Sequence, residues 1–211
     1  ITYTFTANIY DSIVVWRSNI VIDGMNYTLQ GPGRIEYTDG IDCIGVDNVT
    51  IKRTNIKDFY CGIVLLWSSY CTISENNIMN NGESNYKSGG VIVNPSSDHN
   101  NISDNSIVGN SWGIYLEAIS DIIVSGNNVV GNSWGIYTED AFDIDIYGNN
   151  ISNNGYSGIY HDTSSNINIS RNNIAGNSYG TYIIGLSNSV IFMNNIANNY
   201  LTGTYLVGSS I

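Results

Sequence analysis

Asn-Ser-Trp-Gly-Ile-Tyr occupies residues 110–115, and the same six residues occur again at 132–137, 22 residues further along the chain. An Asn-Asn pair followed by an apolar residue recurs in the same region, at 127–129 and again at 149–151. Sequence identity at a fixed spacing of this size is typical of an architecture that stacks one structural repeat on the next. The repeat therefore decides how the rest of the chain is interpreted.

A glycine followed by an apolar residue or threonine marks the same phase along most of the chain. These glycines are Gly40, Gly62, Gly90, Gly113, Gly135, Gly158, Gly180 and Gly203, at steps of 22, 28, 23, 22, 23, 22 and 23 residues. The one long step contains the polar stretch 82–89, which we predict to be a loop insertion. Residues 1–39 precede the first of these regularly spaced glycines and are predicted to form an N-terminal cap and first coil, with the repeat coils of the same domain at 40–211.

Each repeat contains three short runs rich in β-forming residues, for example Ile114–Leu116, Ile122–Val124 and Asn128–Val130. No segment has apolar residues at helical spacing over the length of a helix. We therefore predict an all-β coil with three strands per 22–23 residues, in which each strand pairs in parallel with its counterpart one repeat away, at about 4.8 Å. A β-sandwich is the alternative, and it predicts strands every 8–12 residues or so with no 22-residue identity.

Asparagines and apolar residues also recur in phase. One asparagine column contains Asn77, Asn128, Asn150, Asn173 and Asn195, and a second contains Asn81, Asn110, Asn132, Asn154, Asn177 and Asn199. Side-chain amides stacked in register hydrogen-bond along such a column. The apolar residues expected to point inward are Ile63, Val91, Ile114, Ile136 and Ile159, together with Leu65, Val93 and Leu116.

Composition limits the classes of function. The 211 residues carry 18 acidic and 7 basic side chains, a net charge of −11, which disfavours binding to nucleic acid or to an anionic membrane. No apolar run approaches the roughly 18 residues of a membrane span. Three cysteines do not make a disulfide framework; Cys61 and Cys71 are a possible pair, and burial of all three as small apolar residues is the other interpretation. Such a chain is typical of an extracellular or cell-surface protein.

The Asn-Asn-Ile-x-x-Asn-x-x-Gly-Ile-Tyr motif, in its several copies, and the opening residues 19–24, Asn-Ile-Val-Ile-Asp-Gly, resemble the right-handed parallel β-helix proteins of the pectin lyase-like superfamily. The closer resemblance is to Asn-rich NosD-like repeats of the CASH type. It implies a single-stranded right-handed parallel β-helix over nearly the whole chain. It does not imply one function, since that superfamily contains lyases, glycoside hydrolases, epimerases, a copper-enzyme maturation factor and non-catalytic surface proteins. The polygalacturonase signature of that superfamily has no counterpart here. The lyases of the superfamily use an Arg or Lys base on the same face as their acids, and the repeats here supply no basic residue on the face of Glu117 and Asp162.

Strand alternation predicts an exposed face of tyrosines and carboxylates. The second residue after each glycine gives the column Tyr115, Tyr137, Tyr160, Tyr182 and Tyr205, and two residues further on come Glu117, Glu139 and Asp162. The tyrosines either only stack on one another, or also bind sugar rings, or also form a packing interface. Trp112 and Trp134, one residue before the glycine, are either corner-packing residues or part of the same ligand platform.

The three stacked carboxylates have three interpretations. They form a solvated acidic face, or a Ca²⁺ site of oxygen ligands, or catalytic acids on a sugar-binding surface. His99 and His161 are nearly three repeats apart and are expected to be structural.

Three functional hypotheses follow. The favoured one is a non-catalytic structural or carbohydrate-binding protein, with a polysaccharide of the cell envelope as partner. The second is a polysaccharide lyase or glycoside hydrolase that uses Glu117, Glu139 and Asp162. The third is a surface-layer or filament subunit that self-associates through the ends of its β-helix, because the terminal rung carries unpaired backbone groups.

Overall fold

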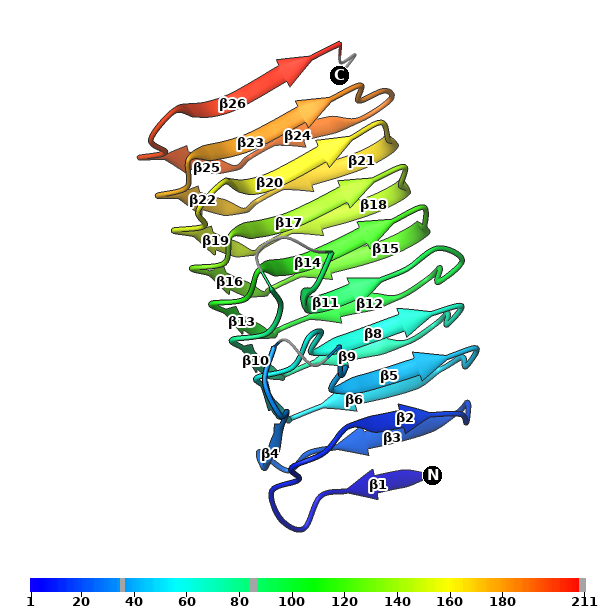
Figure 1. The fold of residues 1–211 in the computed structure, drawn as a ribbon. Coiled ribbons are helices and arrows are strands. Elements are labelled where there is room, and N and C mark those ends of the chain that lie inside the picture. The colour runs from blue at the N-terminus through cyan, green and yellow to red at the C-terminus, as the bar shows by residue number, and fades with distance from the viewer. Residues whose placement is uncertain (35–36, 84–86, 209–211) are drawn as a thin grey trace.

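A computed structural model describes residues 1–34, 37–83 and 87–208 of the chain. Over these residues the chain contains 26 β-strands, arranged in three sheets that coil around one core, and no helix (Figure 1). Three residues of the expected loop insertion at 82–89, numbers 84–86, lie outside the described part. So do residues 35–36 and 209–211, in the predicted cap and repeat regions.

From β2 to β25 each coil contributes one strand to each sheet in the same order, C then A then B, while β1 precedes these coils and β26 follows them. Sheet A contains β1 (Thr2–Thr4), β3 (Ile20–Asp23), β6 (Val49–Lys52), β9 (Thr72–Ser74), β12 (Asn101–Ser103), β15 (Ser120–Ser125), β18 (Phe142–Tyr147), β21 (Ser165–Ser170) and β24 (Val190–Phe192). Sheet B contains β4 (Thr28–Gln30), β7 (Asn55–Lys57), β10 (Asn77–Met79), β13 (Ser106–Val108), β16 (Asn128–Val130), β19 (Asn150–Ser152), β22 (Asn173–Ala175) and β25 (Asn195–Ala197). Sheet C contains β2 (Ile13–Val15), β5 (Ile41–Ile44), β8 (Ile63–Leu66), β11 (Gly89–Val93), β14 (Trp112–Glu117), β17 (Trp134–Glu139), β20 (Ser157–Asp162), β23 (Tyr179–Ile184) and β26 (Thr202–Val207).

Neighbouring strands are parallel and in register with the repeat. Tyr115 pairs with Tyr137 and Glu117 pairs with Glu139 across β14 and β17. In the next coil Tyr137 pairs with Tyr160, and Glu139 with Asp162. The expected coil of three strands per repeat is therefore confirmed. The β-sandwich alternative is wrong because a sandwich consists of two antiparallel sheets, whereas the strands named here form three sheets in which each strand pairs in parallel with its counterpart one coil away.

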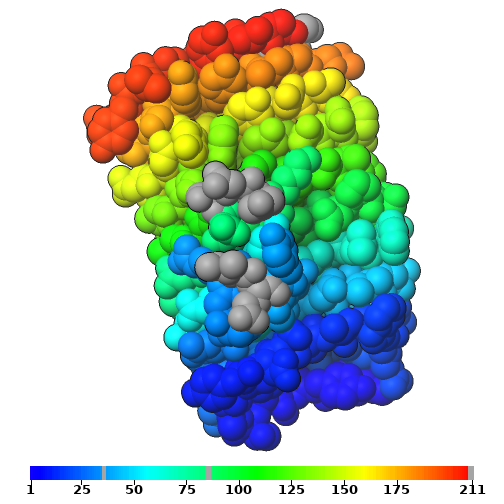
Figure 2. Space-filling model, viewed as in Figure 1, coloured from blue at the N-terminus to red at the C-terminus, as the bar shows by residue number. Residues whose placement is uncertain are grey.

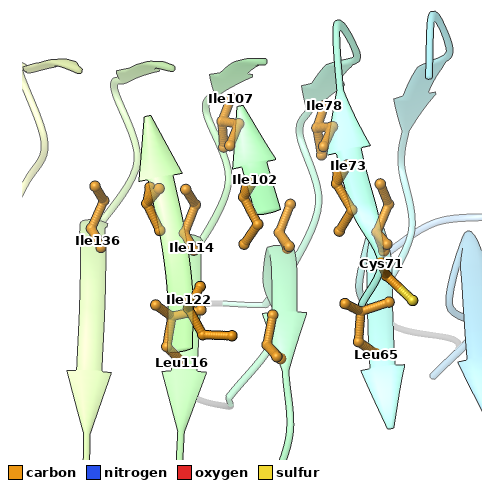
Figure 3. Packing of buried hydrophobic residues seen from close by; sticks show 14 of the residues in the cluster. Leu65, Cys71, Ile73, Ile78, Ile102, Ile107, Ile114, Leu116, Ile122 and Ile136 are labelled. Atoms are coloured by element: carbon orange, nitrogen blue, oxygen red, sulfur yellow. The ribbon is translucent and has the colours of Figure 1, made fainter. Parts of the chain in front are cut away.

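The core is a column of aliphatic side chains from all three sheets. The residues expected to point inward, Ile63, Val91, Ile114, Ile136 and Ile159 with Leu65, Val93 and Leu116, have no exposed surface. Ile114, Leu116 and Ile136 of sheet C face Ile102 and Ile122 of sheet A and Ile107 of sheet B across the interior (Figure 3). Successive coils place equivalent residues above each other. An apolar residue at the same position of every repeat therefore forms a continuous buried column along the whole stack.

Asparagine ladders close the turns of the coil. In the predicted column that contains Asn110 and Asn132, side-chain amides hydrogen-bond from coil to coil at 2.9–3.1 Å within the interior. In the predicted surface column, Asn128, Asn150, Asn173 and Asn195 bond in the same way at 2.7–2.9 Å. Ser106 separates Asn77 from them, and Asn77 bonds instead to Asn55 at 3.3 Å. A third, buried ladder was not anticipated: Asn76, Asn105, Asn127, Asn149, Asn172 and Asn194 bond at 3.0–3.1 Å.

Two connections between coils lie over the outer face of sheet C. Their described parts lead from β4 to β5 and from β10 to β11, and they pass in front of that sheet in Figures 1 and 2. Beneath them Cys61, Val64, Ile92 and Tyr115 form a second apolar cluster outside the main core. Cys43, Cys61 and Cys71 are free and buried, so the possible pair Cys61–Cys71 is not formed. Among the described residues no helix has the length and apolarity needed to cross a bilayer.

Candidate functional site

The outer face of sheet C carries the predicted tyrosine column. Tyr115, Tyr137, Tyr160, Tyr182 and Tyr205 occupy paired positions on five successive strands. Their ring centroids are separated in turn by 5.4, 4.5, 5.3 and 4.7 Å, and the Tyr137 and Tyr160 rings are inclined by only 11°. Parallel, in-register pairing forces this stacking, since each ring starts from the same backbone position one strand spacing away.

A second aromatic row runs beside the column, at the corner where each strand of sheet C begins. Trp112 pairs with Trp134, and Ser157 pairs with Tyr179. The small side chain of Ser157 stands where the two preceding coils have tryptophan, and it leaves a gap in the row. The gap is part of a cleft of about 260 Å³ lined by Trp134, Tyr156, Ser157, Tyr160, Tyr179 and Tyr182, which we call the aromatic cleft.

The walls of the aromatic cleft are fixed by ring contacts. Tyr156 stacks on Trp134 with centroids 4.9 Å apart, and Tyr179 meets Tyr182 edge to face at 5.0 Å. Trp134 also meets Tyr160 edge to face at 5.3 Å. Stacked and edge-to-face contacts of this kind are the favourable arrangements of aromatic rings, so the rings that line the cleft support one another. The sequence placed Trp134, Tyr160 and Tyr182 on a ligand platform; the interruption at Ser157, the signal that marks the cleft, was not recognised.

The predicted carboxylates lie on the same strands, two residues beyond the tyrosines. Glu117, Glu139 and Asp162 pair in register at the ends of β14, β17 and β20, and their side chains are half-buried. Lys87, from the connection between β10 and β11, places its ammonium nitrogen 2.8 Å from Glu117 Oε1 and 3.4 Å from Glu139 Oε2. Asp162 accepts a hydrogen bond of 2.8 Å from the neighbouring Thr163 hydroxyl, and within the described residues it forms no ion pair.

Tyr115 corrects the expectation of a uniformly exposed column. Its side chain has no exposed surface, whereas Tyr137, Tyr160 and Tyr182 are half-buried and Tyr205 is 42% exposed. The Lys87 ammonium lies 5.0 Å from the Tyr115 ring centroid, and Trp112 packs edge-on against that ring at 4.5 Å. Alternation did place Tyr115 on the outer face of the sheet, but the chain that follows β10 covers it.

Electrostatics around Tyr115 keep these groups in their ordinary protonation states. Desolvation, together with Glu117 and Glu139, raises the pKa of the Tyr115 hydroxyl, which donates a hydrogen bond of 3.1 Å to Glu139 Oε2. Desolvation alone would lower the pKa of Lys87, but its bonds to Glu117 and Glu139 outweigh that effect and raise it. Lys87 is therefore a charged ammonium and Tyr115 a neutral phenol over the whole physiological range.

The two histidines lie far from each other in the fold. His161 points into the core with no exposed surface, and its Nδ1 contacts Thr138 Oγ1 while its Nε2 has no partner among the described residues. Burial lowers the pKa of His161 to about 4. His99 stands on the surface, stacked on Tyr70 at 4.7 Å and 3.5 Å from Asp121 Oδ2. Across the described ranges, no three His, Cys, Asp or Glu side chains are grouped so as to hold a metal ion.

Comparison with known families agrees with the architecture. The model of the family described as "Periplasmic copper-binding protein (NosD)" matches residues 8–209. No curated protein matches the chain.

Solved structures resemble the chain in fold. One is the periplasmic alginate epimerase AlgG, with a TM-score of 0.66 and 20% identity, over 92% of this chain and 46% of the epimerase. Another is an alginate lyase from Paenibacillus sp. str. FPU-7, with a TM-score of 0.64 and 16% identity, over 97% of this chain and 91% of the lyase. A third is the Dettilon tailspike protein, with a TM-score of 0.62 and 15% identity, over 98% of this chain and 52% of the tailspike. The chain thus spans about half the length of the epimerase and of the tailspike. At these identities the likeness shows the fold alone, and the right-handed parallel β-helix expected from the resemblance is confirmed.

Proposed function

This chain belongs to the NosD family, and on that premise we propose that it is a non-catalytic, extracytoplasmic β-helix protein that binds a carbohydrate through the aromatic cleft. The observation that carries the proposal is the cleft itself: six residues, five of them aromatic, enclose about 260 Å³ beside a column of stacked tyrosines. Aromatic faces pack against the apolar faces of sugar rings, while the phenol hydroxyls and adjacent carboxylates offer partners for sugar hydroxyls. The periplasmic description of the family and of the alginate epimerase supports a location outside the cytoplasm.

The contacts of the candidate acids favour binding over catalysis. A general acid or base works best with a pKa near the operating pH. Lys87 has a raised pKa and remains an ammonium, and the pKa of Tyr115 is also raised. Glu117 and Glu139 are both bonded to Lys87, and Glu139 also accepts the Tyr115 hydroxyl. These contacts hold Glu117 and Glu139 in place, and of the three candidate acids they leave only Asp162 without an ion pair among the described residues, so no second free carboxylate stands beside it as an acid–base partner.

Copper does not enter the proposal, although the family description names it. Copper sites use imidazole and thiolate or thioether ligands that converge on one point. Here His161 is enclosed in the core, His99 stands on the surface against Tyr70, and the three cysteines are buried and free. The histidines and cysteines described in this chain therefore do not converge on a copper site.

The test is a panel of polysaccharides and oligosaccharides applied to the wild-type chain and two variants. Tyr160→Ala removes one wall of the aromatic cleft, and we expect it to weaken binding about tenfold, the effect of losing one stacked ring. Tyr147→Ala is the matched control, since Tyr147 is a partly exposed tyrosine on sheet A.

Two results would overturn the proposal. One is the absence of binding to every glycan of the panel. The other is the release of reducing ends or unsaturated products, which would favour the lyase or hydrolase hypothesis that uses Glu117, Glu139 and Asp162.

A further inference from the structure

The ammonium group of Lys87 binds to the tyrosine and carboxylate columns on the outer face of sheet C. Lys87 Nζ lies 2.8 Å from Glu117 Oε1, 3.4 Å from Glu139 Oε2 and 5.0 Å from the Tyr115 ring centroid. Two carboxylates stacked one coil apart, beside a tyrosine ring, thus hold one primary ammonium by charge-assisted hydrogen bonds and cation–π attraction. We call this arrangement the Lys87 site.

The next coil repeats the same set of groups. Register places Tyr137 and Tyr160 above Tyr115, and Asp162 above Glu117 and Glu139. No basic side chain of the described residues reaches Asp162, and the following coil has Ile184 in its place. The pair Glu139–Asp162 therefore copies the Lys87 site one coil on, with Tyr137 in the place of Tyr115 and Tyr160 stacked on Tyr137. Of this pair only Glu139 contacts the Lys87 ammonium, and Asp162 has no ammonium supplied by the described residues.

This copy adjoins the aromatic cleft. Tyr160 lines the cleft and lies two residues before Asp162 on the same face of β20, so that their backbones are about 7 Å apart. That distance is comparable to the size of one hexose unit. A sugar ring seated against Tyr160 and Tyr182 therefore has Asp162 within reach of its own substituents or of those of the next unit.

We infer that the ligand of the aromatic cleft is a polymer of amino sugars with free amines, whose ammonium group binds between Asp162 and Glu139 as Lys87 binds one coil earlier. The inference rests on the proposed carbohydrate-binding function. It favours a cationic glycan over a uronate polymer, since a chain of net charge −11 with carboxylates at the cleft repels polyanions. The structurally similar epimerase and lyase are named for alginate, so the inference separates this chain from them.

The experiment compares two β-1,4-linked hexamers by calorimetric titration at pH 5.5, one of glucosamine and one of N-acetylglucosamine, with an alginate hexamer as the anionic probe. The glucosamine hexamer should bind at least about tenfold more tightly than the acetylated one, the usual effect of a hydrogen bond to a charged group. Asp162→Asn should remove this preference. Asp145→Asn, which removes one carboxylate from the outer face of sheet A, should leave it unchanged and so controls for general attraction of a polycation.

Lys87→Met provides an independent arm. It removes the internal ammonium from Glu117 and Glu139, and the glucosamine hexamer should then bind more tightly or at a second site. Equal binding of both hexamers with no effect of Asp162→Asn overturns the amino-sugar inference and leaves carbohydrate binding intact. The same holds if Asp145→Asn and Asp162→Asn weaken binding equally. Failure of every glycan to bind overturns the proposed function itself.

Discussion

Lys87 lies 2.8 Å from Glu117, although the two residues are 30 positions apart and only one of them belongs to the repeat. Stacked carboxylates repel each other and need either protonation or a cation. Here the chain supplies the cation from a connection between coils, and the same ammonium extends to Glu139 at 3.4 Å. The acidic column therefore has one internally neutralised end, at Glu117, and one open end, at Asp162.

Calcium binding to this column remains a prediction, and Lys87 competes with it. In Lys87→Met the carboxylates of Glu117 and Glu139 lose their ammonium, and we expect the affinity for Ca²⁺ to rise about tenfold from a wild-type value in the millimolar range. Isothermal titration with CaCl₂ measures both proteins. Lys57→Met makes the same change in net charge at a pair with Asp58 on another surface, and it should leave the affinity unchanged. Equal gains in both variants would contradict a site at this column.

The buried asparagine ladders should dominate the stability of the coil. The Asn132 carboxamide accepts hydrogen bonds from the backbone and side chain of Asn110, at 2.9 and 3.0 Å, and donates to Ile107 O and Asn154 Oδ1, both at 3.1 Å. Asn132→Ala leaves several of these buried groups unpaired, and we expect the free energy of unfolding to fall by about 3–5 kcal/mol. Urea unfolding followed by circular dichroism measures it.

Asn150→Ala is the control for that prediction. Asn150 belongs to the surface ladder, with bonds of 2.7 Å to Asn128 and 2.9 Å to Asn173, and its side chain is exposed. Water replaces the lost partners there, so the loss should be about 1 kcal/mol or less. Equal losses of unfolding free energy in Asn132→Ala and Asn150→Ala would show that burial of the amide does not determine its contribution to stability.

His161 should make the fold sensitive to mild acid. Its pKa is near 6.5 in an unfolded chain and about 4 in the folded protein, because burial disfavours the imidazolium. Above pH 6.5 neither state binds the proton. As the pH falls from 6.5 to 4 the unfolded state binds it first, so this residue alone lowers the free energy of unfolding, by about 3 kcal/mol at the acid end.

The variant that checks this is His161→Leu, since Leu116 occupies the same inward position two coils earlier. Unfolding free energies measured at pH 7 and pH 4 should differ less in the variant, by about the amount assigned to His161. Parallel pH profiles for the two proteins would mean that His161 does not titrate between the folded and unfolded states.

The glycine column should tolerate no side chain. A Cβ on Gly158 would lie 2.7 Å from Gly180 O and 2.8 Å from Ile174 Cγ2, so Gly158→Ala forces the neighbouring coil away. We expect a loss of about 3 kcal/mol or more in the free energy of unfolding, as for other overpacked interiors. Gly155→Ala, three residues earlier in the same coil, meets nothing closer than 3.6 Å and should be nearly neutral. Thermal denaturation of both variants distinguishes a packing effect from a general effect of losing glycine.

Much of the candidate site follows from phase alone. The residues Tyr137, Tyr160 and Tyr182 were assigned to one outer column, and Glu139 and Asp162 to the next, because side chains alternate along a strand and equal positions stack. The buried ladder of Asn127 and Asn149 was not recognised, since its asparagines stand directly before those of the surface column and the two were not distinguished. The aromatic cleft was missed because it arises from a departure from the repeat, Ser157, rather than from a repeated residue.

The sequence by itself determined the stacking of coils and the vertical alignment of its columns. A period of 22–23 residues with parallel, in-register pairing leaves each side chain only one neighbour of its own kind above and one below. Only the tertiary structure decided that Tyr115 is buried while Tyr160 borders a cleft, and that Lys87 meets Glu117 and Glu139. The cleft depends on Ser157, a single departure from the repeat. The burial of Tyr115 and the contacts of Lys87 depend on where a non-repeating connection crosses the outer face of sheet C, and no periodicity constrains the path of a segment that occurs once.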